Sequence, residues 1–397
     1  MILTKLAKEQ KMSTAVKGQR SLGHHHGEAW AKIGAFLKKN AVLCIALLAA
    51  AVTSCIVPPD KAYLGYFDWK TLTCLFCVLA VVCALRNIRF FTVLARKIVK
   101  LFKNTRASVL ALVYITFLGS MLIANDMALL TFLPLGYFVL SSTDKQKYMA
   151  FTFIMQNIAA NLGGMLTPFG NPQNLYLYTK FHIPTGAFIS TMLPPFCISV
   201  ALITVCCLLF VKKEPLEIAD EEVKLPKWRT IVYGALFALS IVIVFHAIPY
   251  WIGLIVVPLA LLFLDRKALA KVDYGLLLTF LAFFIFAGNM ARIPAVERLF
   301  ETLMSKQPLL VSALSCQAIS NVPSAILLSQ FTDNWRALLV GVNIGGVGTL
   351  ISSLTSLITF REYTSKTQGK AGKYILLFSA FNFAFLGVLT LAEYFIL

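Results

Sequence analysis

The sequence has few charged residues, and acidic residues are the scarcest of them. Asp, Glu, Lys and Arg make up 14% of the 397 residues, whereas a soluble globular protein has about 25%. Hydrophobic residues supply 58% of the chain, and its mean hydropathy is +0.78. Apolar runs long enough to cross about 30 Å of hydrocarbon recur from Asn40 to the C-terminus. These features exclude an ordinary soluble domain and predict an all-α polytopic membrane protein.

Acidic residues number 18 against 36 Lys and Arg, so the formal net charge is +18. Such an excess would suit nucleic-acid binding, but the basic residues concentrate in loops between apolar runs. That distribution follows the positive-inside rule, so we expect a lipid bilayer and no nucleic acid as partner. The basic loops 86–106, 212–229 and 361–373 all fall on the side of the basic tail 1–39. The sequence thus predicts a protein of the plasma or inner membrane, with a cytoplasmic N-terminus.

Motifs for covalent chemistry are missing as well. The apolar runs contain no paired acids, no HExxH and no Ser/Lys dyad, and the chain has no P-loop for direct ATP drive. The nine cysteines lie mostly inside apolar runs, where helix packing explains them, and His24–His26 lie in a polar tail without a Cys or acidic cluster. We therefore expect neither an enzyme nor a cofactor or bound metal.

Two apolar stretches, 107–140 and 309–331, carry polar residues at their centre and return the chain to the side where it began. The first can be read as two spans without a loop or as a re-entrant hairpin, and the shortness of each arm favours the hairpin. With two such hairpins, the sequence predicts about nine spans. They cover roughly residues 40–57, 68–85, 148–180, 184–211, 230–247, 249–264, 273–288, 335–360 and 373–395.

One predicted span contains NLGGMLTPFGNPQN (161–174), which is rich in the residues that break helices. Gly and Pro release backbone N–H and C=O groups from the helical ladder. In lipid each released group costs several kcal/mol unless a partner satisfies it. The released carbonyl oxygens can coordinate a bound cation, and the N–H groups at the start of a half-helix can donate hydrogen bonds to an anion. Such a break therefore indicates a binding site, although one Gly-Gly pair alone would be read as a packing kink.

The chain contains an internal repeat. IANDMALLTF (123–132) aligns with ISNVPSAILL (319–328), and the broken stretch 161–174 aligns with NIGGVGTLISSLTS (343–356). The alignment pairs Asn125 with Asn321, Asn161 with Asn343, Gly163 and Gly164 with Gly345 and Gly346, Thr167 with Thr349, Asn171 with Ser353, and Asn174 with Ser356.

An odd number of crossings separates the two copies, so they are expected to be inverted relative to each other. The predicted units are the basic tail 1–39, a first repeat 40–211, a cytoplasmic loop and linker span 212–248, and a second repeat 249–397. The first repeat contains the hairpin 107–140 and the broken span 148–180. The second contains the hairpin 309–331 and the broken span 335–360. Inverted repeats with broken helices at the midplane are typical of secondary transporters.

The hairpin tips Ala124-Asn125-Asp126 and Ser320-Asn321-Val322-Pro323, with the broken spans from Asn161 and Asn343, resemble those of the ion transporter superfamily. That group includes citrate and dicarboxylate symporters, arsenite permeases and one type of sodium–proton antiporter. The resemblance implies a scaffold domain and a transport domain that moves as an elevator, usually in a homodimer. It also implies that Asn125 and Asn321 touch substrate and ion. The motif TPFGNPQN resembles more closely the arsenite-permease and antiporter-like branch and uncharacterised citrate-transporter-like permeases.

The predicted site lies between the two tips and the two broken spans. The residues expected to bind substrate are Asn125, Thr167, Asn171, Asn174, Asn321, Thr349 and Ser353. The residues expected to couple an ion are Asp126, Asn161, Gly163, Gly164, Ser320, Asn343, Gly345 and Gly346. An intramembrane carboxylate such as Asp126 is by default a functional group, but it could instead cap the second arm of its hairpin.

These features favour a secondary active transporter of a small anion, citrate- or dicarboxylate-like or an inorganic oxyanion. The coupling ion would be sodium or a proton, and no cofactor is expected. A cation–proton antiporter on the same fold is the alternative, with Asp126 exchanging the two ions. From other classes, a channel or a membrane-embedded enzyme would use the same breaks. The charged residues Asp273 and Glu393 are expected near the membrane interface.

Overall fold

The computed structural model describes residues 40–216, 225–367 and 369–397. These residues form α- and 3-10 helices, and their only β-type pairing is an isolated bridge between Asn104 and Pro215. The all-α prediction is confirmed. The predicted tail 1–39 lies outside the described residues.

In the first half of the chain, the described residues from 40 onward form eight α-helices and three short 3-10 helices. They are α2 (Ala41–Ile56), η1 (Lys61–Tyr66), α3 (Trp69–Asn87), α4 (Phe90–Val99), α5 (Thr105–Ile123), α6 (Asn125–Ser142), η2 (Gln146–Tyr148), α7 (Met149–Gly163), η3 (Gly164–Leu166), α8 (Pro172–Lys180) and α9 (Thr185–Phe210).

The second half repeats the order of the α-helices with two additions, α10 at its start and the short α12. Its helices are α10 (Lys227–Val244), α11 (Tyr250–Leu264), α12 (Arg266–Ala270), α13 (Tyr274–Met290), α14 (Pro294–Lys306), α15 (Pro308–Ile319), α16 (Asn321–Leu328), α17 (Trp335–Ile344), α18 (Leu354–Lys366) and α19 (Ala371–Ile396).

Among the described residues, five helices are long and apolar enough to cross a membrane alone: α3, α5, α9, α10 and α19. Four shorter apolar helices, α2, α11, α15 and α17, accompany them, and α13 meets α14 at a bend of 97°. The chain is therefore a multi-pass membrane protein. The count of nine spans stays a prediction, because several predicted spans consist of shorter or broken helices.

The outer helices expose large apolar side chains, which would be unfavourable in contact with water. Leu209 on α9 is 74% exposed, Phe263 on α11 is 75% exposed and Phe395 on α19 is 79% exposed. Contiguous apolar surface on this scale marks contact with lipid or protein. In contrast, α3 lies inside the bundle, and its cysteines Cys74 and Cys77 are buried as free thiols that fill packing space.

Two helical hairpins turn at non-glycine residues with positive φ. Ala124 joins α5 to α6 with φ 64°, and Ser320 joins α15 to α16 with φ 73°. A positive φ is uncommon outside glycine, and such strain clusters at functional sites. In each hairpin the residue after the turn is an asparagine, which begins the second arm.

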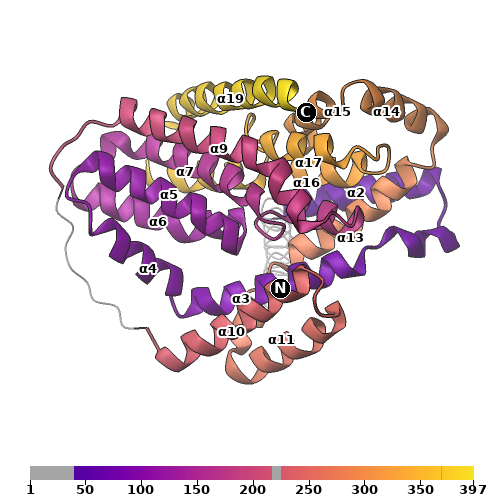
Figure 1. Ribbon diagram of the computed structural model, residues 1–397, viewed down its shortest axis with the longest axis horizontal. Helices are drawn as coiled ribbons and strands as arrows, with labels where there is room; N and C mark the ends of the chain where they lie inside the picture. The colour runs from indigo at the N-terminus through magenta and orange to yellow at the C-terminus, as the bar shows by residue number, and fades with distance from the viewer. Residues whose placement is uncertain (1–39, 217–224, 368) are drawn as a thin grey trace, which may run out of the picture.

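The two halves of the chain pack reciprocally. Helix α2 lies against α13 while α11 lies against α3, and α18 contacts α6 and α7 while α8 contacts α16 and α17. The amphipathic helices α4 and α14 lie toward opposite ends of the longest axis (Figure 1). This reciprocal pattern is the one expected of the predicted inverted repeat.

Candidate functional site

Each broken helix has two separate halves. In the first half of the chain, α7 ends at Gly163 and α8 begins at Pro172; in the second, α17 ends at Ile344 and α18 begins at Leu354. The start of α18 packs against α7, and the start of α8 packs against α17. The breaks therefore meet at one place, called the crossing below.

Asn161, on the last turn of α7, is one centre of the crossing. Its Oδ1 accepts hydrogen bonds from Ser353 Oγ at 2.8 Å and from Thr355 Oγ1 at 3.0 Å, both at the start of α18. A longer bond of 3.4 Å comes from Asn125 Nδ2 at the first hairpin tip. The first broken helix is thus bonded to the second one and to its own hairpin.

Asn343, on the last turn of α17, is the other centre. Its Oδ1 accepts hydrogen bonds from Asn171 Nδ2 at 3.1 Å and from Gln173 Nε2 at 3.4 Å, both at the start of α8. Its Nδ2 donates to Asn174 Oδ1 at 2.6 Å. The donors to Asn343 occupy the positions that match the donors to Asn161 in the repeat alignment.

The hairpin tips use their asparagines in the same way. Asn125 Oδ1 accepts from the N–H of Asp126 at 2.9 Å, and Asn321 Oδ1 accepts from the N–H of Val322 at 2.9 Å. Each asparagine thereby satisfies a backbone donor at the start of its helix. Ser320 Oγ donates to Asn321 Oδ1 at 3.3 Å, so this predicted ion ligand also lies at the tip.

Thr167 and Thr349 tie the breaks back to their own hairpins. Thr167 Oγ1 donates to the carbonyl of Met121 at 2.7 Å, and Thr349 Oγ1 donates to the carbonyl of Gln317 at 3.1 Å. Both carbonyls lie one turn before a hairpin tip. These hydroxyl protons are already used in the folded chain, so only the oxygen lone pairs remain for a ligand.

The paired glycines serve two purposes. A Cβ on Gly163 would lie 2.2 Å from the carbonyl oxygen of Phe117, and one on Gly345 would lie 2.9 Å from Ala313 Cα, so both allow close packing on the hairpin. At Gly164 a Cβ would lie 2.3 Å from Asn171 Oδ1. At Gly346 it would lie 3.2 Å from Asn321 Nδ2. The second glycine of each pair therefore leaves room for the polar side chains of the crossing.

Asp126 is the carboxylate at the first hairpin tip. It is 6% exposed, and its Oδ1 has no hydrogen-bond partner among the described residues. The N-cap position of α6 is Ala124, which provides no side-chain cap. The carboxylate lies in the first turn of α6, where the positive end of the helix dipole favours an anion.

Several site residues were missed from the sequence. Gln173 and Thr355 complete the reciprocal bonds, and Gln317 holds the second break by donating to the carbonyls of Gly345 at 2.9 Å and Val347 at 3.2 Å. Asn157 Nδ2 donates to Ser356 Oγ at 3.3 Å. A usable signal was present, because Asn157 and Gln317 each lie one turn before a predicted site residue on an apolar helix.

The crossing offers neutral oxygen ligands, and the first hairpin tip adds one buried carboxylate. Asn171 Oδ1, Gln173 Oε1 and Asp126 Oδ1 are buried acceptors without a hydrogen-bond partner among the described residues. Hard cations prefer oxygen ligands of these kinds. Within the described ranges, no group of three His, Cys, Asp or Glu side chains forms a transition-metal site. These oxygens are of the kind that could coordinate a small cation.

A multi-pass helical bundle whose broken helices meet in a polar crossing has the architecture of a membrane transporter. A profile of the CitMHS family, described as "Citrate transporter", matches residues 30–335. The chain therefore belongs to the citrate transporter family. The resemblance to the ion transporter superfamily, drawn from the hairpin tips and breaks, is confirmed.

Two relatives support the same family. The chain is 34% identical over 312 residues to the uncharacterized transporter MJ0456 of Methanocaldococcus jannaschii, a match covering 78% of this chain and 85% of that protein. It is 30% identical over 311 residues to the inner membrane protein YbiR of Escherichia coli, covering 76% and 82%. The YdaH transporter of Alcanivorax borkumensis aligns over 89% of this chain and 97% of its own, with 13% identity and a TM-score of 0.47.

Proposed function

We propose that this protein is a secondary active transporter that moves a small anion together with sodium ions or protons. The anion would belong to the citrate and dicarboxylate class or to the inorganic oxyanions. Membership of the citrate transporter family supports this reading. The protein would act in the plasma or inner membrane, with its N-terminus in the cytoplasm.

The observation that carries the proposal is the reciprocal bonding of the crossing. Asn161 and Asn343 each accept from the start of the other broken helix. Amide and hydroxyl groups are thus concentrated where the backbone is released from helical bonding. Transporters with broken helices bind substrate and coupling ion at such places.

The two tips differ in charge, which assigns them different partners. The first tip carries the buried Asp126 carboxylate, whose Oδ1 has no hydrogen-bond partner among the described residues, so it suits a cation or a proton. The second tip, Ser320-Asn321-Val322, carries no acid and begins α16. Its helix N-terminus suits the anion.

The test is the melting temperature of the purified protein in detergent. Citrate, succinate, phosphate and arsenite would each be added with and without sodium at two pH values. A ligand at about 100 times its dissociation constant adds roughly 2.7 kcal/mol to the free energy of unfolding. We expect an anion-induced rise that requires sodium or low pH and that disappears in Asn125→Ala. Ser190→Ala, at an exposed position on α9, is the control.

The alternative is a cation–proton antiporter, favoured by the buried carboxylate of Asp126. In that case sodium alone would raise the melting temperature, Asp126→Asn would remove the rise, and no anion would have an effect. That set of results would overturn the anion proposal.

An elevator motion within a homodimer completes the proposal. The crossing and both hairpins would move together against α3 and α13. Saturable uptake with counter-transport in proteoliposomes is expected for such a carrier, and linear, unsaturable flux would indicate a channel.

A further inference from the structure

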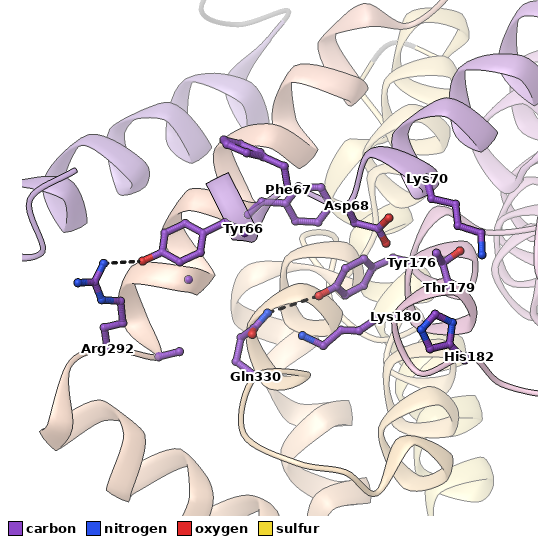
Figure 2. A pocket seen from close by; sticks show the side chains of 14 residues that line it. Tyr66, Phe67, Asp68, Lys70, Tyr176, Thr179, Lys180, His182, Arg292 and Gln330 are labelled. Atoms are coloured by element: carbon purple, nitrogen blue, oxygen red, sulfur yellow. Dashed lines mark hydrogen bonds between the residues drawn. The ribbon is translucent and has the colours of Figure 1, made fainter. Parts of the chain in front are cut away.

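A cavity of about 500 Å³ lies where α3, α8 and α13 approach one another beside the loop after α16 (Figure 2). The positive-inside prediction places the start of α3 and the ends of α8 and α13 on one side of the membrane, the outer side. Tyr176 lines the cavity and lies little more than one helical turn from Asn171 of the crossing. Cavities of about 300–1,000 Å³ accommodate small ligands.

The lining of the cavity is cationic. Lys70 and Lys180 are both half-buried there, and neither forms an ion pair with another described residue. The carboxylate of Asp68, also in the lining, is already engaged. It accepts from the Thr71 N–H at 2.9 Å and from the Thr71 hydroxyl at 2.5 Å as the cap of α3. The two lysines therefore leave an excess of positive charge.

A buried hydroxyl adds a second, independent indication of a ligand. Thr179 is 4% exposed and lines the cavity, yet its Oγ1 has no hydrogen-bond partner among the described residues. Its neighbours in the lining are satisfied, since Tyr176 shares a bond of 2.9 Å with Ser329 and receives one of 3.5 Å from Gln330. Buried hydroxyls are normally hydrogen bonded, so Thr179 is suited to donate to a ligand.

An ion pair lies at the rim of the cavity. Arg292 binds Asp60 at 2.6 Å and donates to the Tyr66 hydroxyl at 3.1 Å, which fixes η1 against the end of α13. A Cβ on Gly288 would lie 2.6 Å from the Tyr66 ring, so the glycine permits this contact. The cavity is thus bounded by ordered side chains.

A second cavity lies beside α18. It is lined by the starts of α2 and α13, including Asp273, and by α18, including Arg361. Asp273 caps α13 by accepting from the Leu276 N–H at 2.9 Å, as Asp68 caps α3. Each broken helix therefore leads from the crossing to a cavity with a basic residue, one on each predicted side of the membrane.

We propose that the cavity beside α8 is an outer vestibule that receives a small anion, a carboxylate or a phosphate-type oxyanion, on its way to the crossing. Lys180 and Lys70 supply the positive charge, and Thr179 supplies a hydroxyl donor. The inference rests on the proposed function in that the anion is the transported one. A lipid headgroup phosphate has the same chemistry, and the experiment separates the two sources.

The test places a thiol in the cavity. Gly65 lines it and has no atom within 4 Å of a built Cβ, so Gly65→Cys fits without disturbance. The purified protein in zwitterionic liposomes is reacted with an anionic sulfonate methanethiosulfonate and with a cationic trimethylammonium one. Wild-type protein gives the background from its exposed Cys55 and Cys197. Citrate, succinate and inorganic phosphate are tested as protectants.

We expect the anionic reagent to react faster at Gly65→Cys and at least one anion to slow it. Adding Lys180→Gln should lower the ratio of anionic to cationic rates by about fivefold, a change that high salt reduces. Lys306→Gln, an exposed charge change on the same predicted side, should leave the ratio unchanged. Equal rates for both reagents, or protection that appears only when phosphatidylglycerol is added, would overturn the proposal.

Uptake measurements separate the vestibule from the proposed function. In proteoliposomes, Lys180→Gln should raise the KM for the transported anion about fivefold with an unchanged maximal rate, while Lys180→Arg keeps the wild-type KM. Normal anion uptake with charge-independent labelling would overturn the vestibule alone. Charge-selective labelling in a protein that transports no anion would overturn the proposed function alone.

Discussion

At the scale of single residues, Asp126 distinguishes the two hairpin tips. Its position in the repeat is held by Val322 in the second tip, so the carboxylate has no counterpart there. The neighbouring asparagines do match, and each bonds the N–H that follows it. Asp126 is thus the one acidic side chain that distinguishes the two tips.

Asp126→Asn should therefore uncouple transport without unfolding the protein. The amide keeps the shape of the side chain, but it does not take up and release a proton, and it has no negative charge to balance a cation. Uptake driven by a sodium or pH gradient should fall by about tenfold or more, equivalent to about 1.4 kcal/mol, while anion counterflow persists. The measurement is driven uptake and counterflow in the same proteoliposomes, and unchanged driven uptake would contradict the role of Asp126.

Glu393 lies in the last turn of α19, near the end of a helix as expected. Its side chain is fully buried, and neither carboxylate oxygen has a hydrogen-bond partner among the described residues. Its place near the membrane interface stays a prediction.

Glu393→Gln should stabilise the protein. Burial of an unpaired carboxyl group is unfavourable, and the amide removes the charged form at almost the same volume. The free energy of unfolding should rise by about 1–3 kcal/mol, measured as a higher melting temperature in detergent. A lower melting temperature would contradict a destabilising effect of the buried carboxyl group.

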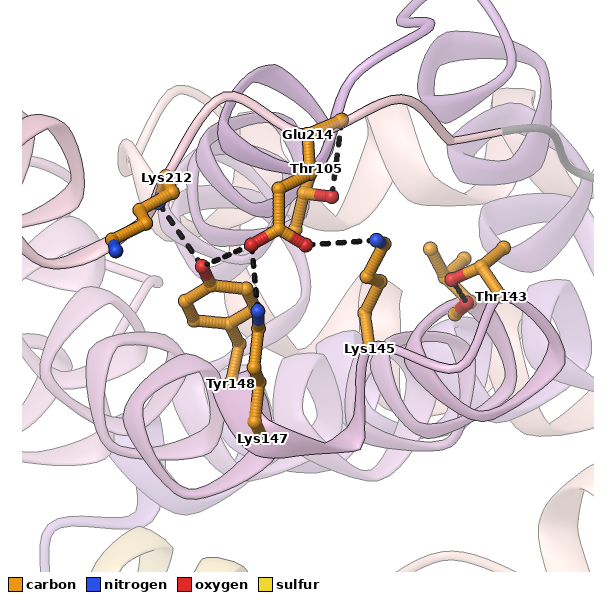
Figure 3. A network of polar contacts seen from close by, with 8 residues as sticks. Thr105, Thr143, Lys145, Lys147, Tyr148, Lys212 and Glu214 are labelled. Atoms are coloured by element: carbon orange, nitrogen blue, oxygen red, sulfur yellow. Dashed lines mark hydrogen bonds and ion pairs between the residues drawn. The ribbon is translucent and has the colours of Figure 1, made fainter.

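At the scale of elements, residues 211–216 after α9, called the strap, are bonded to the starts of α5 and α7 (Figure 3). Glu214 accepts from Lys145 at 2.8 Å, from Lys147 at 2.6 Å and from the Tyr148 hydroxyl at 3.0 Å. Its own carbonyl accepts from the Thr105 N–H at 2.8 Å. The strap joins α5, α7 and α9 on the side predicted to be cytoplasmic.

The strap gives a pH-dependent prediction. Hydrogen bonds from Lys145 and then Lys147 lower the pKa of Glu214 from 4.5 to about 2. Because the folded-state pKa is depressed, the stabilisation is complete above about pH 4.5 and is lost as the pH falls toward about 2. At neutral pH, Glu214→Gln should speed tryptic cleavage after the exposed Lys212 and Lys213.

The matched control is Glu362→Gln, since that carboxylate lies 4.0 Å from Lys366 and forms only a weak pair. It should not change the cleavage rate in the strap. The stability of the two proteins should converge in acid, where Glu214 is protonated. A difference in melting temperature between Glu214→Gln and wild type that grows below pH 4 would contradict this explanation.

Glycine substitutions test the contact between a broken helix and its hairpin. Gly163→Ala places a Cβ 2.2 Å from a backbone oxygen of α5 and should cost about 1–3 kcal/mol by overpacking. Gly186→Ala and Gly387→Ala have nothing within 4 Å and should be neutral or stabilise their helices by about 0.5–1 kcal/mol. Melting temperatures of the three variants give the comparison, and equal effects would refute the packing role of Gly163.

At the scale of the whole molecule, much of the architecture was predictable from the sequence. The turn of the first hairpin at Ala124 and the gap between α7 and α8 lie where Asn125-Asp126 and the Gly-Pro-Asn-rich stretch indicated. Helix breakers and hydropathy act locally, so a linear reading can find them. The reciprocal bonds of Gln173 and Thr355 were not predictable, because they depend on which ends meet in space.

The predicted orientation can be checked on residues that flank described helices. Lys213→Cys after α9 should react with an impermeant maleimide only in inside-out vesicles, and Lys306→Cys at the end of α14 only in right-side-out vesicles. The positive-inside rule is the basis of this expectation. Labelling from the same side in both variants would contradict the inverted arrangement.

The reciprocal packing also bears on how the chain holds together. Helix α2 rests on α13, α11 rests on α3, and each broken helix completes the other's hydrogen bonds. A chain cleaved between α9 and α10 would therefore yield two fragments, and neither fragment would contain all the residues of the crossing. When the two fragments are produced together, they should associate in the bilayer and copurify. The non-covalent contacts between the halves are more extensive than the single segment that connects them.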